Sequence, residues 1–179
     1  SIYRPSIPVV YNCGGYESVD TLKALEGKIQ IYLPDFKYSD PSLSAAFSAA
    51  QDYPQTALSA LKEMYRQVGP CKFGEGGILK SGMIVRHLVL PGHLKNSYGV
   101  IDLFADTFEK GTVLFSLMSQ YTPPQDKSLP FKELNRRITT FEYNRVYDYM
   151  VKKGVDYGFC QERSSAKEEY TPDFDLSGF

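Results

Sequence analysis

Short apolar runs alternate along this chain with longer segments in which apolar residues recur every three or four positions. The short runs are typical of buried strands, and the longer segments are typical of amphipathic helices. Because the two kinds of segment alternate, the pattern predicts an α/β fold with parallel strands joined by crossover helices. The expected strands are 7–11, 29–33, 83–90, 112–118 and 157–161, and the expected helices are 18–25, 41–50, 55–68, 96–109 and 139–153.

Two local patterns refine these elements. The glycine-rich segment 71–82 is predicted to be a hairpin, because no strand leads into it and no GxxxxGK sequence follows, as a phosphate-binding loop would require. Thr139 is a candidate N-cap for the last helix, and Glu142, three residues later, is its expected capping-box partner.

Length and charge limit the function classes. At 179 residues the chain suits one domain or part of a larger barrel. Its net charge of -1 provides no excess of cations for nucleic acid or an anionic membrane, so neither is an expected partner. No stretch approaches the roughly 20 apolar residues of a membrane span, and no signal sequence is recognisable, so a soluble, cytoplasmic protein is expected. The tail, 164–179, is polar and is predicted to be irregular.

Cysteine and histidine are sparse. The three cysteines are far apart in the sequence, which argues against a disulfide framework and against a compact zinc or iron-sulfur site. The two histidines are too few for a histidine-rich metal site. A hydrolase is disfavoured because no serine lies in a GxSxG sequence. No residue of the chain is therefore assigned as a catalytic group or a metal ligand.

Polar residues follow or interrupt the expected strands. Asp35 and Lys37 follow strand 29–33 and, being two residues apart, point to the same side of an extended chain. Asn12 precedes the pair Gly14-Gly15 at the end of the first strand. In a parallel sheet these strand ends meet at one edge, where ligands bind in α/β proteins. A plain turn at Asn12 and a solvated Asp/Lys pair remain the simpler alternatives.

Arg86 lies inside an apolar strand, where a guanidinium needs an anion to offset its desolvation. That anion is either Asp35, in a structural ion pair, or a ligand. Tyr121, beyond strand 112–118, is either a packing aromatic or a plate for a flat ring. Together these side chains suit a ligand with a carboxylate, hydroxyls and a ring. His87 alternates with Arg86 and should point the opposite way, but the sequence does not say which side faces the site.

Several segments carry a resemblance to a family. They are Asp-Phe-Lys at 35–37, Ile-Val-Arg-His-Leu-Val-Leu-Pro-Gly at 84–92, Met-Ser-Gln-Tyr at 118–121, Pro-Val-Val-Tyr-Asn at 8–12 with Gly14-Gly15, and 133–139 before the last helix. In this order the chain resembles the second half of radical S-adenosylmethionine enzymes, and in particular proteins related to the pyruvate formate-lyase activating enzyme. The resemblance implies that 1–163 form a partial (β/α) TIM-like barrel, the second half of such a domain.

The resemblance also implies cofactors. Such enzymes cleave S-adenosylmethionine reductively at a [4Fe-4S] cluster to give a 5'-deoxyadenosyl radical, and the cluster ligands come from a CxxxCxxC loop in an amino-terminal half. The 179 residues contain no such sequence and lack the family's Gly-Gly-Glu segment. The chain alone is thus expected to be inactive. Expected partners are the amino-terminal half or a complementary chain, and, because activating enzymes act on a glycine backbone, a protein substrate is a candidate.

Five cofactor-binding residues follow from the resemblance. Asp35 and Lys37 match the acidic and basic members of the strand-end motif at the cofactor and cation site. Arg86 is a candidate for the cofactor's carboxylate or ribose. Tyr121 is at the position of a histidine near the adenosyl group, and Asn12 is where activating enzymes often have an aspartate that helps to hold a monovalent cation. The alternative from another class is a non-catalytic nucleotide-binding or scaffold module.

Overall fold

The computed structural model describes residues 7–125 and 129–160. It contains a six-stranded sheet in the order β1-β2-β4-β5-β6, with β3 antiparallel to β4. In chain order the elements are β1 Val10–Cys13, α1 Val19–Ala24, β2 Ile31–Pro34, α2 Pro41–Ser48, α3 Tyr53–Val68, β3 Lys72–Phe73, η1 Glu75–Gly77, β4 Leu79–Leu88, α4 Leu94–Thr107, β5 Leu114–Met118, η2 Lys132–Asn135, α5 Thr140–Lys152 and β6 Gly158–Cys160.

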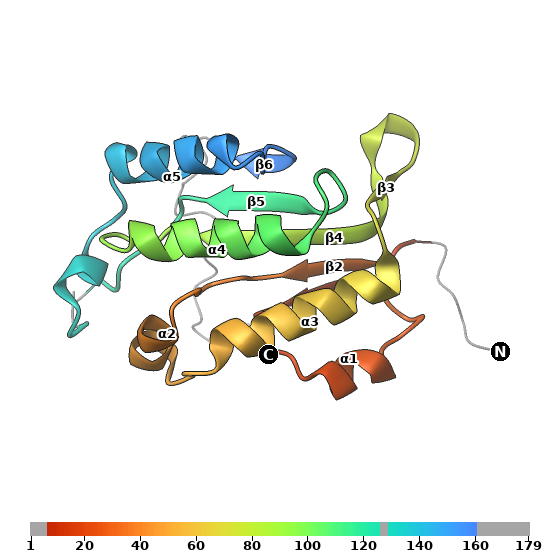
Figure 1. Ribbon diagram of the computed structural model, residues 1–179, viewed down its shortest axis with the longest axis horizontal. Helices are drawn as coiled ribbons and strands as arrows, with labels where there is room; N and C mark the ends of the chain where they lie inside the picture. Colours follow the sequence, from red (N-terminus) through yellow and green to blue (C-terminus); the bar gives the residue numbers. More distant parts are fainter. Residues whose placement is uncertain (1–6, 126–128, 161–179) are drawn as a thin grey trace, which may run out of the picture.

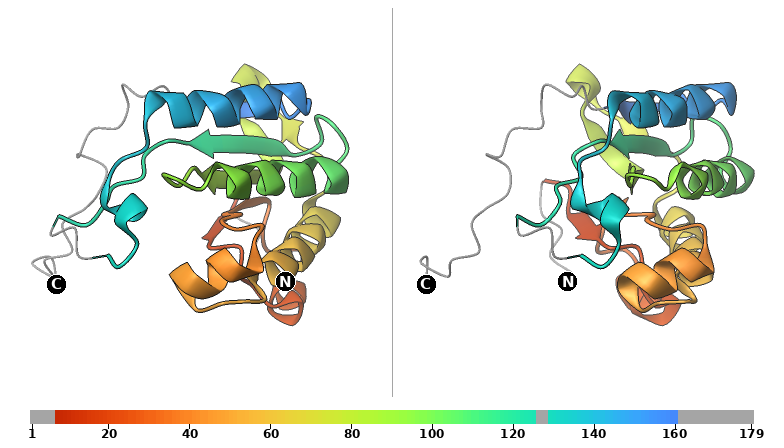
Figure 2. Two further views of the ribbon diagram at one scale, coloured as in Figure 1. Left: turned by 60° about the vertical axis from the view of Figure 1, so that its left-hand side comes forward. Right: turned by 90° about the vertical axis from the view of Figure 1, so that its left-hand side faces the viewer.

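Strands that follow one another in the chain lie side by side and run parallel, apart from the short β3. The helices α3, α4 and α5 lie together on one face of the sheet (Figures 1 and 2). The predicted α/β fold with a parallel sheet and crossover helices is therefore confirmed. The described strands form an open sheet with β1 and β6 at its edges, so the partial barrel remains a prediction.

The expected strands and helices are present with shifts of a few residues at their ends. The largest shift is in β4, which begins at Leu79 rather than at the expected residue 83, because β3 pairs with its first half. The glycine-rich segment 71–82 is accordingly a hairpin, as predicted. The end of the last expected strand at 161, the domain boundary at 163 and the tail 164–179 lie outside the described residues. None of the described helices is long and apolar enough to cross a membrane.

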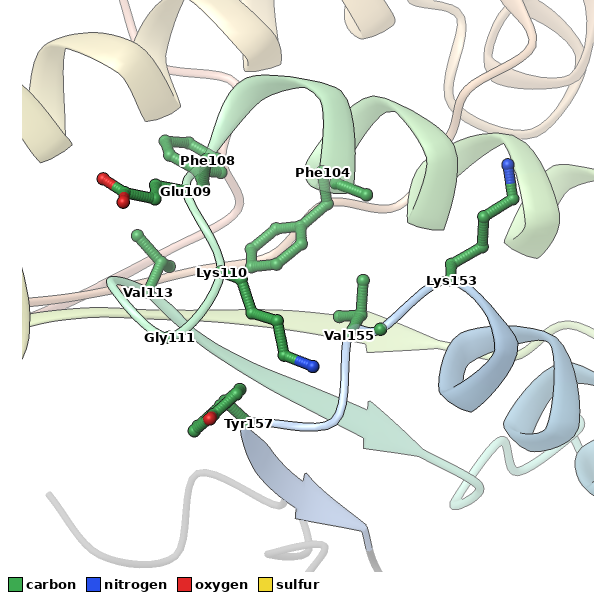
Figure 3. A pocket seen from close by; sticks show the side chains of 11 residues that line it. Phe104, Phe108, Glu109, Lys110, Gly111, Val113, Lys153, Val155 and Tyr157 are labelled. Atoms are coloured by element: carbon green, nitrogen blue, oxygen red, sulfur yellow. The ribbon is translucent and has the colours of Figure 1, made fainter.

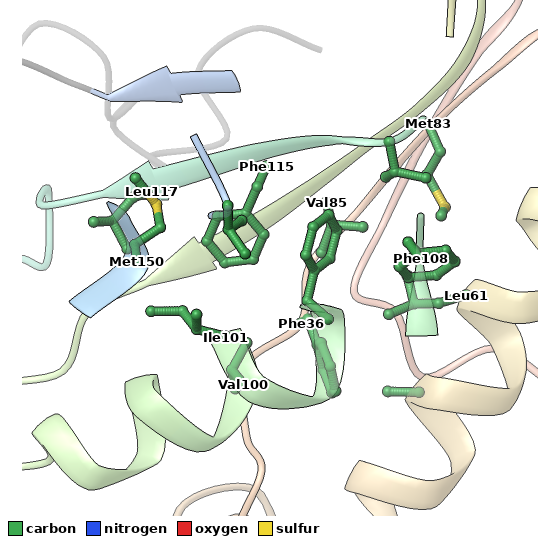
Figure 4. Close-up of a cluster of buried hydrophobic side chains, with 14 of the residues drawn as sticks. Phe36, Leu61, Met83, Val85, Val100, Ile101, Phe108, Phe115, Leu117 and Met150 are labelled. Carbon is green, nitrogen blue, oxygen red and sulfur yellow. The ribbon is translucent and has the colours of Figure 1, made fainter. Parts of the chain in front are cut away.

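The core lies between the sheet and the helices (Figure 4). Alternate residues of β4 and β5 point into it, and the side chains of Val85, Phe115 and Leu117 are almost completely buried against α4 and α3. Burial of an apolar side chain of this size contributes roughly 1.5–3 kcal/mol. The opposite residues of the same strands face the other side of the sheet, where the described residues provide no helical cover.

Helix α5 begins as the sequence predicts. Thr139 is the N-cap, and its side chain and that of Glu142 form a complete capping box. Glu142 also accepts hydrogen bonds from the Gly92 N–H, over 2.8 Å, and from both terminal nitrogens of Arg136. These donors hold the pKa of the Glu142 carboxyl well below its usual range. The carboxylate thereby ties the start of α5 to the turn after β4.

His87 points into the core rather than toward the open face. Its Nδ1 lies 2.8 Å from the Phe36 carbonyl oxygen and its Nε2 lies 2.8 Å from Ser97 Oγ on α4. Because a carbonyl only accepts, Nδ1 carries the proton and Nε2 accepts from the Ser97 hydroxyl. Complete burial lowers the pKa of the imidazole to about 4. The neutral imidazole of His87 therefore links β4 by hydrogen bonds to the β2–α2 loop and to α4.

The buried imidazole makes stability depend on pH. The pKa of His87 falls from 6.5 in the unfolded chain to about 4 in the folded one, so the unfolded state binds more protons between these values. The contribution of the neutral His87 to the free energy of unfolding is complete above pH 6.5 and is lost as the pH falls toward 4. The total loss is on the order of 3 kcal/mol. Urea unfolding at pH 7 and pH 4.5 should show a steeper loss for the natural chain than for His87→Gln. Equal losses would contradict the prediction.

Candidate functional site

Four of the five predicted site residues lie together at the carboxyl ends of β1, β2 and β4. Nη2 of Arg86 donates a 2.7 Å hydrogen bond to Asn12 Oδ1 and lies 2.7 Å from Asp35 Oδ1. Nζ of Lys37 is 3.9 Å from Asp35 Oδ2. Asp35 and Arg86 are paired by an isolated parallel bridge just beyond β2. The parallel register thus brings residues from three strand ends to one place.

The cluster faces the side of the sheet opposite to the helices. Arg86 alternates with the buried Val85 and His87, and Asp35 alternates with the buried Pro34 and Phe36. The side chains of Asp35 and Arg86 are 21% and 24% exposed, whereas that of Lys37 is 47% exposed. Arg86 is therefore a fixed, half-buried cation, and Lys37 is a cation with freedom to move.

Two polar atoms of the cluster lack hydrogen-bond partners within the part of the chain that the structure describes. Among the described residues, Arg86 Nε and Asp35 Oδ1 are buried and have no hydrogen-bond partner. The Asp35–Arg86 contact at 2.7 Å is thus an ion pair by distance, without hydrogen-bond geometry at Oδ1. An unpaired buried donor costs about 1–3 kcal/mol. A ligand oxygen or a water molecule at Arg86 Nε would remove that cost.

One tyrosine hydroxyl holds the loops after β1 and β2 together. Tyr53, in the first turn of α3, lies 3.0 Å from the Gly14 carbonyl and 3.2 Å from the Asp35 carbonyl, and it accepts the Lys37 N–H over 2.9 Å. Gly15 has φ of +80°, and a Cβ there would lie 1.9 Å from the Asp35 carbonyl oxygen. The second glycine of the pair Gly14-Gly15 is thus explained by close backbone contact between two loops.

Asn96 on α4 fixes the other end of the loop after β2. Its Nδ2 donates to the Lys37 carbonyl over 2.9 Å, and its Oδ1 accepts the Ser39 N–H over 2.9 Å. Sequence analysis did not identify Tyr53 or Asn96, because neither belongs to a local motif. Asn96 contacts Lys37 across 59 positions of sequence, and only the completed fold reveals such a contact.

Tyr121 is not joined to this cluster. Its hydroxyl donates to the Leu134 carbonyl in η2 over 2.8 Å, and burial raises the pKa of the phenol. Within 7–125 and 129–160, no hydrogen bond or ion pair connects Tyr121 to the other four residues. Its assignment to a ligand's ring therefore stays a prediction.

The described residues offer little to a metal ion. They contain no group of three or more histidine, cysteine, aspartate or glutamate side chains that could hold one. Cys13 lies beside the cluster, but burial raises the pKa of its thiol to about 11, so it remains protonated at neutral pH. What the four clustered side chains can do is bind an anionic or hydroxyl-bearing group through Arg86 and Lys37.

A hollow of about 80 Å³ lies at the opposite ends of the strands (Figure 3). Its two lysines already have partners, since Lys110 pairs with Asp156 over 3.2 Å and Lys153 pairs with Asp102 over 2.6 Å. The remaining lining is largely apolar and includes Phe104. The strand-end cluster is therefore the better candidate for a functional site.

Comparison with known proteins gives the fold but not a family. No family model matches the chain. An uncharacterized protein of Methanocaldococcus jannaschii is 26% identical over 152 residues, which are 84% of this chain and 40% of that protein. The chain thus spans less than half the length of this relative. The crystal structure of a domain of pyruvate-formate lyase-activating enzyme from Bacteroides vulgatus matches 80% of this chain and 74% of its own, with a TM-score of 0.53 and 11% identity.

Comparing Gly15→Ala with Gly27→Ala should distinguish the cost of the close loop contact from the cost of backbone strain. Gly27 has a similar φ of +77° but open space around it, so Gly27→Ala should cost only the strain of that conformation, about 1–2 kcal/mol. Gly15→Ala adds the collision with the Asp35 carbonyl and should cost more than about 3 kcal/mol. Chemical unfolding measures the loss in the free energy of unfolding for each variant. Similar losses would show that the two loops can move apart at little cost and would contradict the prediction.

Proposed function

We propose that this chain is the carboxy-terminal part of a radical S-adenosylmethionine protein of the activating-enzyme type, and that its strand-end cluster binds the cofactor's polar groups. The observation that carries the proposal is the half-buried Arg86, whose Nε lacks a hydrogen-bond partner in the described residues. The fold likeness to a domain of pyruvate-formate lyase-activating enzyme supports it. So does the resemblance of the motifs at 35–37, 84–92 and 118–121.

Each clustered residue has a proposed role. The Arg86 guanidinium takes a carboxylate or ribose oxygen of S-adenosylmethionine, because its planar donors suit such groups. Lys37, which is more exposed, adds a second cation that follows the ligand. Asp35 and Asn12 accept from ribose hydroxyls or from the ligand's amino group and keep Arg86 in place. Tyr121 is assigned to the adenosyl group on the resemblance alone.

The iron-sulfur cluster is assigned to another part of the protein. When bound, a [4Fe-4S] cluster supplies the electron that cleaves S-adenosylmethionine, and it requires a set of cysteine thiolates. Cys13, Cys71 and Cys160 have no CxxxCxxC spacing. The proposal therefore places the cluster ligands outside these 179 residues, and the chain alone is inactive.

The open face of the sheet suits a complementary polypeptide. Leu33, Ile84 and Leu88 are only half-buried on this face, and Val10 on the edge strand β1 is 51% exposed. Within the described residues β1 pairs only with β2, so its other edge can accept a strand. A polypeptide that adds strands beside β1 would extend the sheet next to Val10 and Asn12 and so approach the cluster.

Substitution of Lys37 tests the cofactor site. Lys37→Ala should weaken S-adenosylmethionine binding about tenfold and leave stability nearly unchanged, because the side chain is half exposed. Lys62→Ala, at an exposed position on α3, is the matched control and should change neither. Titration calorimetry measures the affinity and chemical unfolding the stability. Unchanged affinity for Lys37→Ala would remove Lys37 from the site.

Reconstitution tests whether the cluster ligands lie outside these 179 residues. Iron and sulfide are added without oxygen to this chain and to a longer form that includes any in-frame upstream coding sequence. Only the longer form should hold about four irons and cleave S-adenosylmethionine. Tight cofactor binding by the short chain, with no iron in either form, would instead indicate a nucleotide-binding module. Failure of both forms to bind the cofactor would refute the proposal.

A further inference from the structure

Two adjoining hollows lie on the helical side of the molecule. A hollow of about 800 Å³ lies between the start of α2, the turn after β4 and the start of α5. A second hollow of about 300 Å³ lies between α4 and α5, which run side by side (Figure 1). Both hollows are lined by Tyr98 and Arg145. We call the two together the α4–α5 groove.

The groove presents cations that have no anionic partner. Lys95 and Arg145 are exposed and line it, and no described residue forms a salt bridge with either. The guanidinium of Arg145 lies 5.9 Å from the ring centre of Phe141. Lys152 adds a third cation at the other end of the groove. These charges favour a ligand that carries carboxylates or other anionic groups.

Aromatic side chains also line the groove. Phe141 lines the first hollow although the residue is 70% exposed. Tyr98 stacks on Tyr149 with ring centres 4.3 Å apart, and both rings line the second hollow. Large aromatic residues that are exposed in a groove are typical anchors for apolar side chains of a binding partner. The ligand therefore has apolar as well as anionic groups.

The shape and charge of the groove favour a peptide over other ligands. Two adjoining hollows suit an extended chain better than a single small anion. A nucleic acid is disfavoured because the net charge of the chain, -1, provides no excess of cations for its closely spaced phosphates. Asp40 and Asp148 also line the groove, so a partner with a few carboxylates matches its charge better than a continuous polyanion. We propose that the α4–α5 groove binds an extended peptide segment of a partner protein, in which carboxylates are next to apolar or aromatic side chains. This proposal is independent of the cofactor site.

Selection from a random dodecapeptide library on the full chain tests the proposal. The selected peptides should combine Asp or Glu with Phe, Tyr or Leu. Lys95→Glu and Arg145→Glu should each reduce their affinity about tenfold in fluorescence polarisation. Lys62→Glu makes the same change at an exposed position on α3, outside the groove, and should leave the affinity unchanged. Unfolding midpoints confirm that the variants fold.

Three results would overturn the peptide assignment. The first is selection of no peptides, or of peptides without acidic residues. The second is selection of acidic peptides whose affinity does not respond to Lys95→Glu and Arg145→Glu, which would place them elsewhere on the molecule. The third is displacement of the peptides by inorganic phosphate, or tighter binding of a single-stranded oligonucleotide, which would identify a small anion or a nucleic acid as the occupant.

Discussion

The parallel pairing of β4 with β2 on one side and β5 on the other is the constraint on which both the core and the candidate site depend. Successive residues of β4 point to opposite faces of the sheet. Val85 and His87 are therefore buried under the helices, while Arg86 between them faces the open side beside Asp35. A shift of one residue in register would bury the guanidinium among apolar side chains and expose the imidazole.

Local patterns were sufficient to predict most of the fold. Alternating apolar runs and helical periods gave the order of elements, and Thr139 with Glu142 gave the start of α5, because capping depends on neighbours in the sequence. The early start of β4 was missed because it depends on pairing with β3 rather than on its own apolar content. The sequence did not establish closure of the sheet into a barrel, since closure depends on partners of the edge strands.

The candidate site was only partly predictable. Asp35, Lys37 and Asn12 were found from their positions after strands, and Arg86 from its place in an apolar strand. The ion pair between Arg86 and Asp35 matches the first of the two alternatives, in which the anion beside Arg86 is a carboxylate of the chain itself. Tyr53 and Asn96 were missed, because their hydrogen bonds join parts of the chain that are distant in sequence.

The Tyr53 hydroxyl has a consequence for any molecule that binds at the strand ends. It contacts the backbone of the loops after β1 and β2, of which the second carries Asp35 and Lys37, and its ring is packed at the start of a long helix. Asn96 fixes the second of these loops from another helix. Binding would then lose little free energy to the ordering of loops, because the fold has already ordered them. Affinity at this edge would depend mainly on chemical fit to a preorganised surface.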